Sequence, residues 1–146
     1  MNQTDTEATL TITPCPEGTM SNFYAGFGMM GGIVVENSIY GMASKLCERY
    51  KGGCWQMSEA VHEEGRALFV HPIMSDERVT VHSPNGATEE MSAEALGIVA
   101  CLFVSSSLSF SDKRNMAERC AQWHHEVREA VLSGHPEVKA IIRIID

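Results

Sequence analysis

Positively charged residues are scarce in this 146-residue chain, and the first 44 residues contain none. The whole sequence has 11 Lys and Arg against 19 Asp and Glu, which gives a net charge of −8. Proteins that bind the phosphates of nucleic acids concentrate cations on one face. The composition therefore argues against direct nucleic-acid binding, and it suits either a basic protein partner or simple solubility.

The sequence also lacks a signal segment and a long apolar run. Its N-terminus, MNQTDTEATLTIT, has no basic stretch followed by an apolar one, so we do not expect a secretory signal. A helix that crosses a bilayer needs about 20 apolar residues, whereas the apolar stretch at residues 95–104 has only ten. These absences predict a cytoplasmic protein that does not enter a membrane.

Signatures of catalysis and cofactor binding are missing as well. Closely paired Cys or His residues usually announce a zinc site, but the five cysteines stand far apart, at Cys15, Cys47, Cys54, Cys101 and Cys120. We expect them to be reduced, and three of them to be buried in helices. No Gly-x-Ser-x-Gly elbow surrounds residues 105–107, and Gly31-Gly32 lacks the rest of a phosphate-binding loop. We therefore expect no catalytic, cofactor-binding or metal-binding residues.

The most informative stretch that is present spans residues 91–110, MSAEALGIVACLFVSSSLSF. Between positions 95 and 104 only Gly97 is not hydrophobic, so this predicts a helix that is apolar on every side and lies in the centre of a domain. Ser92 is a good N-cap, and Glu94 follows where a carboxylate meets the positive end of the helix dipole. We predict a buried central helix that begins at Ser92.

Two segments precede the first clear helical pattern. Residues 9–13, TLTIT, are β-branched and predict an edge strand that ends at Pro14, so residues 1–16 form an edge strand or a partly ordered N-terminus. Residues 17–32 hold five glycines, three aromatics and three methionines without helical or strand periodicity, which indicates an irregular, partly buried segment. Its large apolar residues either tuck under the domain or form a partner surface: Phe23, Tyr24, Phe27, Met29 and Met30.

Residues 34–50 have the spacing of an amphipathic helix. Gly52-Gly53 follow where the chain must reverse, so the helix is predicted to end at Tyr50 or Lys51. Its apolar face consists of Ile39, Met42, Ala43, Leu46, Cys47 and Tyr50. Three strand candidates come next, at residues 54–57, 67–71 and 78–82, and because no helix separates them they predict an antiparallel meander.

The C-terminal third predicts two more helices. Ser111 is the expected N-cap of the first, with Asp112 in its first turn and Gly134 at its end; its apolar stripe is Met116, Cys120, Trp123, Val127, Ala130 and Val131. The last begins at Pro136 and buries Val138, Ile141, Ile142 and Ile145, although its isoleucines leave a strand as the alternative. The fold class predicted for residues 1–146 is α+β, a single compact domain with a small antiparallel sheet (meander) and about four helices, one of them central and fully buried.

These residues resemble the ArdB/KlcA antirestriction proteins of plasmids, phages and genomic islands. Three groups carry the resemblance in the family's order: Glu36-Asn37, Ile39-Tyr40-Gly41-Met42, Leu46-Cys47, Tyr50 and Gly52-Gly53-x-Trp55; Met91-Ser92-Ala93-Glu94-Ala95, Gly97-Ile98-Val99-Ala100 and Leu102-Phe103; and His135-Pro136-Glu137, Ile141 and Arg143-x-Ile145-Asp146. The chain departs from the family pattern at residues 27–32, where it has no cation.

The resemblance implies a cytoplasmic protein that lets incoming plasmid or phage DNA escape type I restriction enzymes, without a catalytic triad or cofactor. We expect it to bind a protein partner, either a type I restriction complex or a host factor controlling one, and to be a monomer or weak dimer. One alternative is an acidic mimic of DNA, in which carboxylates imitate phosphates. Another is a Cys- or His-dependent hydrolase that uses Cys54, Cys120, His124 or His125.

Overall fold

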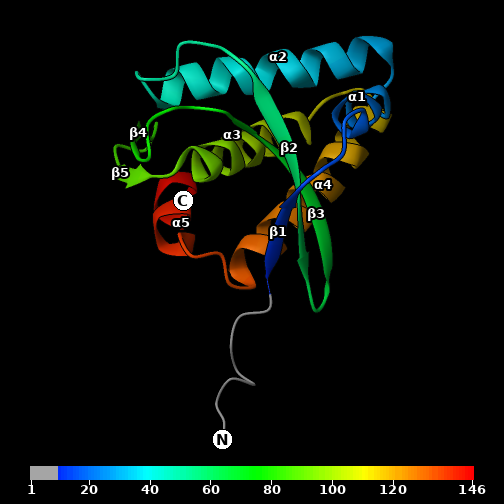
Figure 1. Ribbon diagram of the computed structural model, residues 1–146. Coiled ribbons are helices and arrows are strands. Elements are labelled where there is room, and N and C mark those ends of the chain that lie inside the picture. The colour runs from blue at the N-terminus through cyan, green and yellow to red at the C-terminus, as the bar shows by residue number, and fades with distance from the viewer. Residues whose placement is uncertain (1–9) are drawn as a thin grey trace, which may run out of the picture.

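The computed structural model describes residues 10–146, which form five helices and five strands arranged around helix α3 (Figure 1). The helices are α1 Thr19–Ala25, α2 Met29–Leu46, α3 Ala93–Leu108, α4 Arg114–Leu132 and α5 Val138–Ile145. The strands are β1 Thr11–Pro14, β2 Trp55–His62, β3 Gly65–Pro72, β4 Val79–His82 and β5 Thr88–Met91. Helix α3 contacts α2, α4, α5 and β3, so most of the described chain packs against it.

Helix α3 is central and begins as predicted. The Ser92 hydroxyl accepts a hydrogen bond from the Ala95 amide, so Ser92 is the N-cap. Its residues are buried continuously from Ala95 to Leu102. At Gly97 an added Cβ would collide with the Val70 carbonyl and with His71 on β3. The missing side chain at Gly97 therefore lets the sheet pack directly on the helix.

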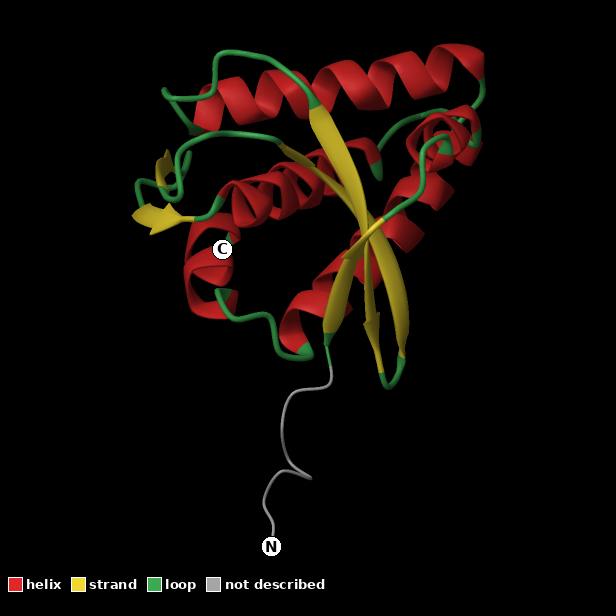
Figure 2. Ribbon diagram, viewed as in Figure 1, coloured by secondary structure: helices red, strands yellow, loops and turns green. Residues whose placement is uncertain are grey.

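The predicted small antiparallel sheet is confirmed, but its third strand pairs elsewhere. Strands β2 and β3 form a hairpin, and β1 lies at the edge beside β2, as expected for the strand ending at Pro14. Strand β4 does not continue the meander: it pairs with β5 in a separate two-stranded sheet (Figure 2). The sequence reading missed β5 because its Glu89-Glu90 pair has low strand propensity. Pairing with β4 and burial of Met91 stabilise the strand instead.

The prediction of an irregular segment at residues 17–32 is wrong, because this segment forms α1 and the first turn of α2. Gly18 and Gly28 have positive φ values of 97° and 86° and stand just before each helix, so these two glycines shape the helix starts rather than interrupt helices. Glycine's weak helix propensity concealed the two helices in the sequence. Residue 9 of the predicted N-terminal strand lies outside the described residues.

Other helix boundaries differ by a few residues. Helix α2 ends at Leu46, where Cys47 turns extended, rather than at Tyr50. Gly52 and Gly53 have positive φ, as predicted for a chain reversal, but they lie in the loop after the helix. Helix α4 starts at Arg114 instead of beside Ser111, because the Ser111 hydroxyl accepts the Lys113 amide in a local turn.

The apolar faces of the last two helices support one hydrophobic core. All six residues of the predicted α4 stripe are buried. In α5 the buried residues are Ile141 and Ile144, while the predicted Val138, Ile142 and Ile145 are half-buried. Because α5 is only two turns long and starts at Val138, its buried side falls on positions three apart. The core cluster includes residues from all five helices.

Candidate functional site

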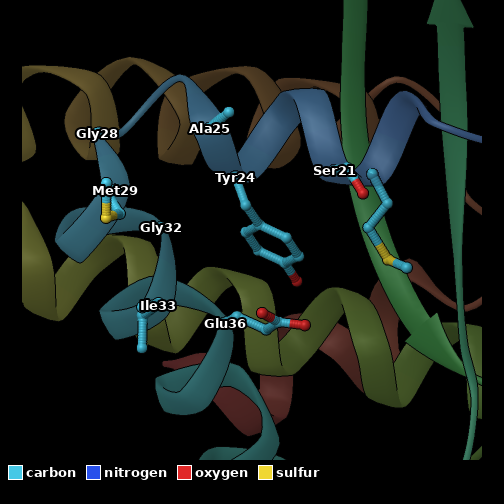
Figure 3. Close-up of a pocket in the computed structure, with 9 residues that line it drawn as sticks. Ser21, Tyr24, Ala25, Gly28, Met29, Gly32, Ile33 and Glu36 are labelled. Atoms are coloured by element: carbon cyan, nitrogen blue, oxygen red, sulfur yellow. The ribbon is translucent and has the colours of Figure 1, made fainter.

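A surface groove between α1 and α2 is the candidate interaction site. We call it the α1–α2 groove, and its lining residues are Met20, Ser21, Tyr24, Ala25, Gly28, Met29, Gly32, Ile33 and Glu36 (Figure 3). Its volume is about 290 Å³. Pockets for small-molecule ligands usually enclose about 300 to 1,000 Å³. The groove is therefore at the small end of this range and has room for one or two side chains.

Two glycines create the groove. Gly28 has a φ of 86° and reverses the chain between α1 and α2. Gly32 faces the backbone of α1, where a Cβ would lie only 2.5 Å from the Tyr24 carbonyl oxygen. Any side chain at position 32 would therefore push the two helices apart.

The rim of the groove is apolar and exposed. Met29 and Met30 are 84% and 69% exposed, and Ile33 and Val34 follow on the same face of α2. Exposed apolar patches of neighbouring residues often mark interaction sites, and methionine adapts its shape to a partner. Of the residues that the sequence proposed either for burial or for a partner surface, the methionines are therefore at the surface.

The aromatic residues of the same segment lie inside. Tyr24 and Phe27 are 8% and 5% exposed. Phe23 and Phe27 make edge-to-face contacts with Trp123 on α4, with ring centroids 5.0 and 6.3 Å apart. This packing fixes α1 on α4 and leaves one face of the early α2 turns open.

Polar groups lie in the interior part of the groove. Glu36 accepts a hydrogen bond of 2.6 Å from the Tyr40 hydroxyl. The Tyr24 hydroxyl points toward Glu36 (Figure 3) and has no hydrogen-bond partner within residues 10–146. Burial raises the pKa of Tyr24 and also that of Tyr40, where the hydrogen bond to Glu36 adds to the effect. Both phenols therefore stay protonated near neutral pH and remain hydrogen-bond donors.

A second polar cluster ties α3 to α5. We call it the Ser92–Glu137 cluster, and it consists of Ser92, Glu94, His135 and Glu137. The Ser92 amide and hydroxyl both donate to the Glu137 carboxylate, the amide at 2.9 Å. The Glu137 amide donates to His135 Nδ1 at 2.9 Å, so the ring proton sits on Nε2 and is donated to Glu94 at 3.0 Å.

The geometry of the Ser92–Glu137 cluster indicates a structural role. His135 is 3% exposed, and its hydrogen bond is the main reason why the pKa of Glu94 is lowered. Arg78 adds an ion pair to Glu137 at 3.6 Å. Each buried polar group is satisfied, which is the pattern of a tie between two helices rather than of an open reaction site.

The four residues of the hydrolase alternative do not gather into one site. Cys54 is exposed in a loop, and His125 is on the exposed face of α4. Cys120 is buried, its thiol donates to Met116, and burial raises its pKa to about 11. Within residues 10–146, no hydrogen bond joins a cysteine to a histidine.

His124 is half-buried and pairs with a serine that solvent cannot reach. Its Nδ1 lies 3.0 Å from the Ser105 hydroxyl and 3.2 Å from the Leu102 carbonyl. Ser105 is fully buried. Burial lowers the pKa of His124. The pair therefore joins α3 to α4 and offers no nucleophile to a substrate.

Between residues 10 and 146 no three His, Cys, Asp or Glu side chains come close enough together to bind a metal ion. In the same range, none of the helices combines the length and the hydropathy that a membrane crossing requires.

Sequence reasoning missed parts of both polar regions. It singled out aromatic and methionine residues of the groove but not Met20 or Ile33, and it named Glu36 only as part of a family motif. The signal that was available is the helical spacing of apolar residues 29, 30, 33 and 34. The Ser92–Glu137 pairing joins residues 45 positions apart, which no local pattern could reveal.

Comparisons with known proteins agree on one family. The sequence model described as antirestriction protein matches residues 48–146. The antirestriction protein KlcA of Escherichia coli is 32% identical over 112 residues, which cover 76% of each chain. The uncharacterized proteins YafX and YfjX of Escherichia coli strain K12 are 29% and 31% identical over 142 and 145 residues; each match covers 96% of this chain and 90% of the relative.

A solved structure shares the fold over its whole length. It comes from a study of KlcA and ArdB, which showed antirestriction activity against type I DNA restriction systems in vivo but not in vitro. The TM-score is 0.77 at 29% identity, and the match covers 100% of both chains. The α1–α2 groove lies before residue 48, where the family match begins, whereas the Ser92–Glu137 cluster lies within that match. The chain belongs to the antirestriction protein family.

Proposed function

We propose that this protein alleviates type I restriction of incoming unmodified plasmid or phage DNA by binding a protein rather than by catalysis. The observation that carries the proposal is the likeness, over the full length of both chains, to a structure from the KlcA and ArdB study. That study connects this fold with activity against type I systems. The match of the antirestriction family over residues 48–146 supports the same assignment.

In this proposal the binding partner is a protein of the restricting cell. The KlcA and ArdB activity was seen in vivo but not in vitro, as expected when a required component is missing from a purified reaction. That component is either a host factor controlling the restriction complex or the complex in its cellular state. The protein would then act in the cytoplasm, where incoming DNA meets the restriction enzyme.

The side-chain arrangement supports an interaction mechanism over catalysis. The cysteine and histidine candidates lie apart, and the serine that pairs with His124 is fully buried. The α1–α2 groove instead offers exposed apolar residues next to a carboxylate. One core cluster drawing on all five helices also supports our proposal that the chain acts as one antirestriction-type domain.

DNA mimicry is supported less well by the acidic residues. Several of the carboxylates that would have to imitate phosphates form ion pairs with arginines within the chain. These pairs are Asp76 with Arg49, Glu59 with Arg66, Glu89 with Arg143, and Glu118 with Arg114. The pairing reduces the regular negative surface that a mimic needs.

An efficiency-of-plating experiment tests the proposed function. Unmodified phage is plated on a type I restricting host with and without the expressed protein, and on a non-restricting host as the reference. The protein should raise plating toward the reference and leave plating of modified phage unchanged. Equal plating of unmodified phage with and without the protein would contradict the proposal.

A cleavage assay separates direct from indirect inhibition. Purified type I enzyme cleaves unmodified DNA in the presence of this protein, either alone or with an extract of the restricting host. Inhibition by the protein alone indicates that it binds the restriction complex. Inhibition that requires the extract indicates a host factor.

A further inference from the structure

We propose that the α1–α2 groove binds a Lys or Arg side chain that stands among apolar residues in a segment of the protein partner. This inference rests on the proposed function, because it names the surface and the partner chemistry of the same interaction.

The rim matches the stem of a long cationic side chain. Lys and Arg lay their methylene groups along apolar surfaces and keep the charged head in a polar environment. Met29 and Ile33 line the groove and are 84% and 48% exposed, so they can cover such a stem. Apolar neighbours in the partner segment would then contact Met30 and Val34, which are exposed on the same face of α2.

The charge of the groove selects a cation. Glu36 is the one charged residue in the lining, and it lies beside the apolar rim. Glu17 is the only other acid in residues 10–44, and this range contains no Lys or Arg. Arg119 approaches α1 from α4, but its guanidinium lies over the Phe27 ring at 5.1 Å and is not part of the groove lining. The groove therefore favours a positively charged occupant.

The Tyr24 hydroxyl provides an independent observation. The residue is more than nine-tenths buried, and its hydroxyl is aimed at Glu36 without a hydrogen-bond partner in residues 10–146 (Figure 3). Buried hydroxyls are nearly always paired, so an exception calls for an explanation. In the proposed complex the cation draws the Glu36 carboxylate into the groove, and Tyr24 then donates to that carboxylate. In the free protein the Tyr24 hydroxyl is therefore an unpaired donor, and it becomes hydrogen-bonded in the proposed complex.

The open space beside the groove is larger than one side chain needs. A neighbouring hollow of about 450 Å³ shares Met20 and Ser21 with the groove, and its lining also includes Glu17 and Gln56. The two hollows together form a path past α1 that suits a short extended segment. Because a second acid lies along this path, further basic residues in the segment would also be favoured.

Site-specific crosslinking in restricting cells tests the inference. A photocrosslinking residue replaces Met29, which is 84% exposed at the groove, or Ile73, which is 60% exposed elsewhere. The crosslinked peptide of the partner is then identified by mass spectrometry. We expect a peptide with Lys or Arg beside apolar residues from position 29 and not from position 73. An acidic peptide, a second copy of this chain, or the same product from both positions would overturn the inference.

Charge variants provide the decisive comparison. Glu36→Lys should reduce the crosslink yield at position 29 and the gain in plating by at least about tenfold, since like charges at an interface cost several kcal/mol and 1.4 kcal/mol is tenfold. Glu36→Gln should reduce both in the same direction by a smaller factor, and it keeps an acceptor for Tyr40. Glu48→Lys, an exposed acid outside the groove, is the matched control and should retain both.

The outcomes separate this inference from the proposed function. If the unchanged protein protects phage and Glu36→Lys protects equally well, the groove assignment is wrong and the antirestriction function stands. If the unchanged protein does not protect, the proposed function itself fails. Thermal melts of each variant confirm that a loss does not come from unfolding.

Discussion

The Ser92–Glu137 cluster and the α1–α2 groove differ in whether their buried polar groups are hydrogen-bonded. In the cluster, Ser92, His135 and Glu137 all have hydrogen-bond partners. In the groove, the Tyr24 hydroxyl has no partner within the described chain, and methionines nearby face the solvent. The contrast indicates that the cluster stabilises the fold, and it supports our proposal that the groove contacts another protein.

The two regions also differ in how they relate to the family. Ser92, Glu94, His135 and Glu137 belong to the motifs that carry the resemblance, and they lie within the matched residues 48–146. The groove lies before that match, and of its lining residues only Glu36 belongs to the motifs that carry the resemblance. Most of the residues that carry the resemblance therefore build the fold. The candidate interaction surface is identified instead by exposure, charge and an unpaired hydroxyl.

Leu102→Ala should give the largest loss of stability, because it leaves a cavity in the core around α3. The Ser92–Glu137 cluster lies at the start of this helix. Leu102 is 1% exposed in α3, and such substitutions cost about 2 to 5 kcal/mol. The free energy of unfolding is measured by urea denaturation. Leu132→Ala, at a residue that is 52% exposed, is the control and should change it little. Equal stability of both variants would show that α3 is not central.

Ser92→Ala should come next, because the cluster loses both an N-cap and a hydrogen bond to a carboxylate. Capping contributes about 1 kcal/mol and a charge-assisted bond about 1.5 to 3 kcal/mol, so a loss of roughly 2.5 to 4 kcal/mol is expected. Ser21→Ala in the groove is the matched variant and should stay within about 0.5 kcal/mol. A similar loss at both serines would remove the distinction between the two regions.

Tyr24→Phe should leave stability unchanged or raise it by about 1 kcal/mol, because it removes a buried hydroxyl that is unpaired in the free chain. The same change should lower the protection of unmodified phage. Stability is measured by urea denaturation of the purified proteins, and protection is measured by plating on the same strains that are used for the unchanged protein. A clear loss of stability would mean that the hydroxyl is already bonded in the free protein.

The smallest expected effect is a pH dependence from the cluster. The hydrogen bond from His135 lowers the folded-state pKa of Glu94 below its ordinary value of 4.5. Its stabilising contribution is therefore complete above that ordinary value and is lost as the pH falls through the folded-state pKa. Because Glu94 is about one-third exposed, the effect should be about 1 kcal/mol or less. Melts from pH 6 to 3 should fall less steeply for Glu94→Gln, and identical slopes would count against this role.

Local sequence patterns predicted the parts of the fold that depend on neighbouring residues. The Ser92 N-cap and the buried stripe of α4 follow from capping and helical spacing alone. Helix α1 could not be predicted in this way, because its stability comes from Phe23 and Phe27 packing on Trp123 about 100 positions away. Likewise, β4 pairs with β5 rather than β3 through tertiary contacts that no strand pattern specifies.

The candidate site was predictable in composition but not in geometry. The sequence showed methionines, aromatics and glycines together in residues 17–32. It could not show which of them face outward, because Gly32 and the Tyr24 carbonyl set the helix crossing through a contact in three dimensions. Glu36 belongs to the site because the first turns of α2 lie beside α1, which places this carboxylate in the same groove as Tyr24.

The most direct test of the account compares Met29→Lys with the unchanged protein in the plating assay. Met29 is the first residue of α2 and is 84% exposed, so a lysine there should cost only about 0.3 to 1 kcal/mol of stability through the helix dipole. The account predicts that the unchanged protein and the control Ile73→Lys protect unmodified phage, whereas Met29→Lys, which still folds in a thermal melt, does not, because it replaces an apolar contact with a charge that repels the cationic partner segment. Full protection by Met29→Lys, or no protection by the unchanged protein, would contradict it.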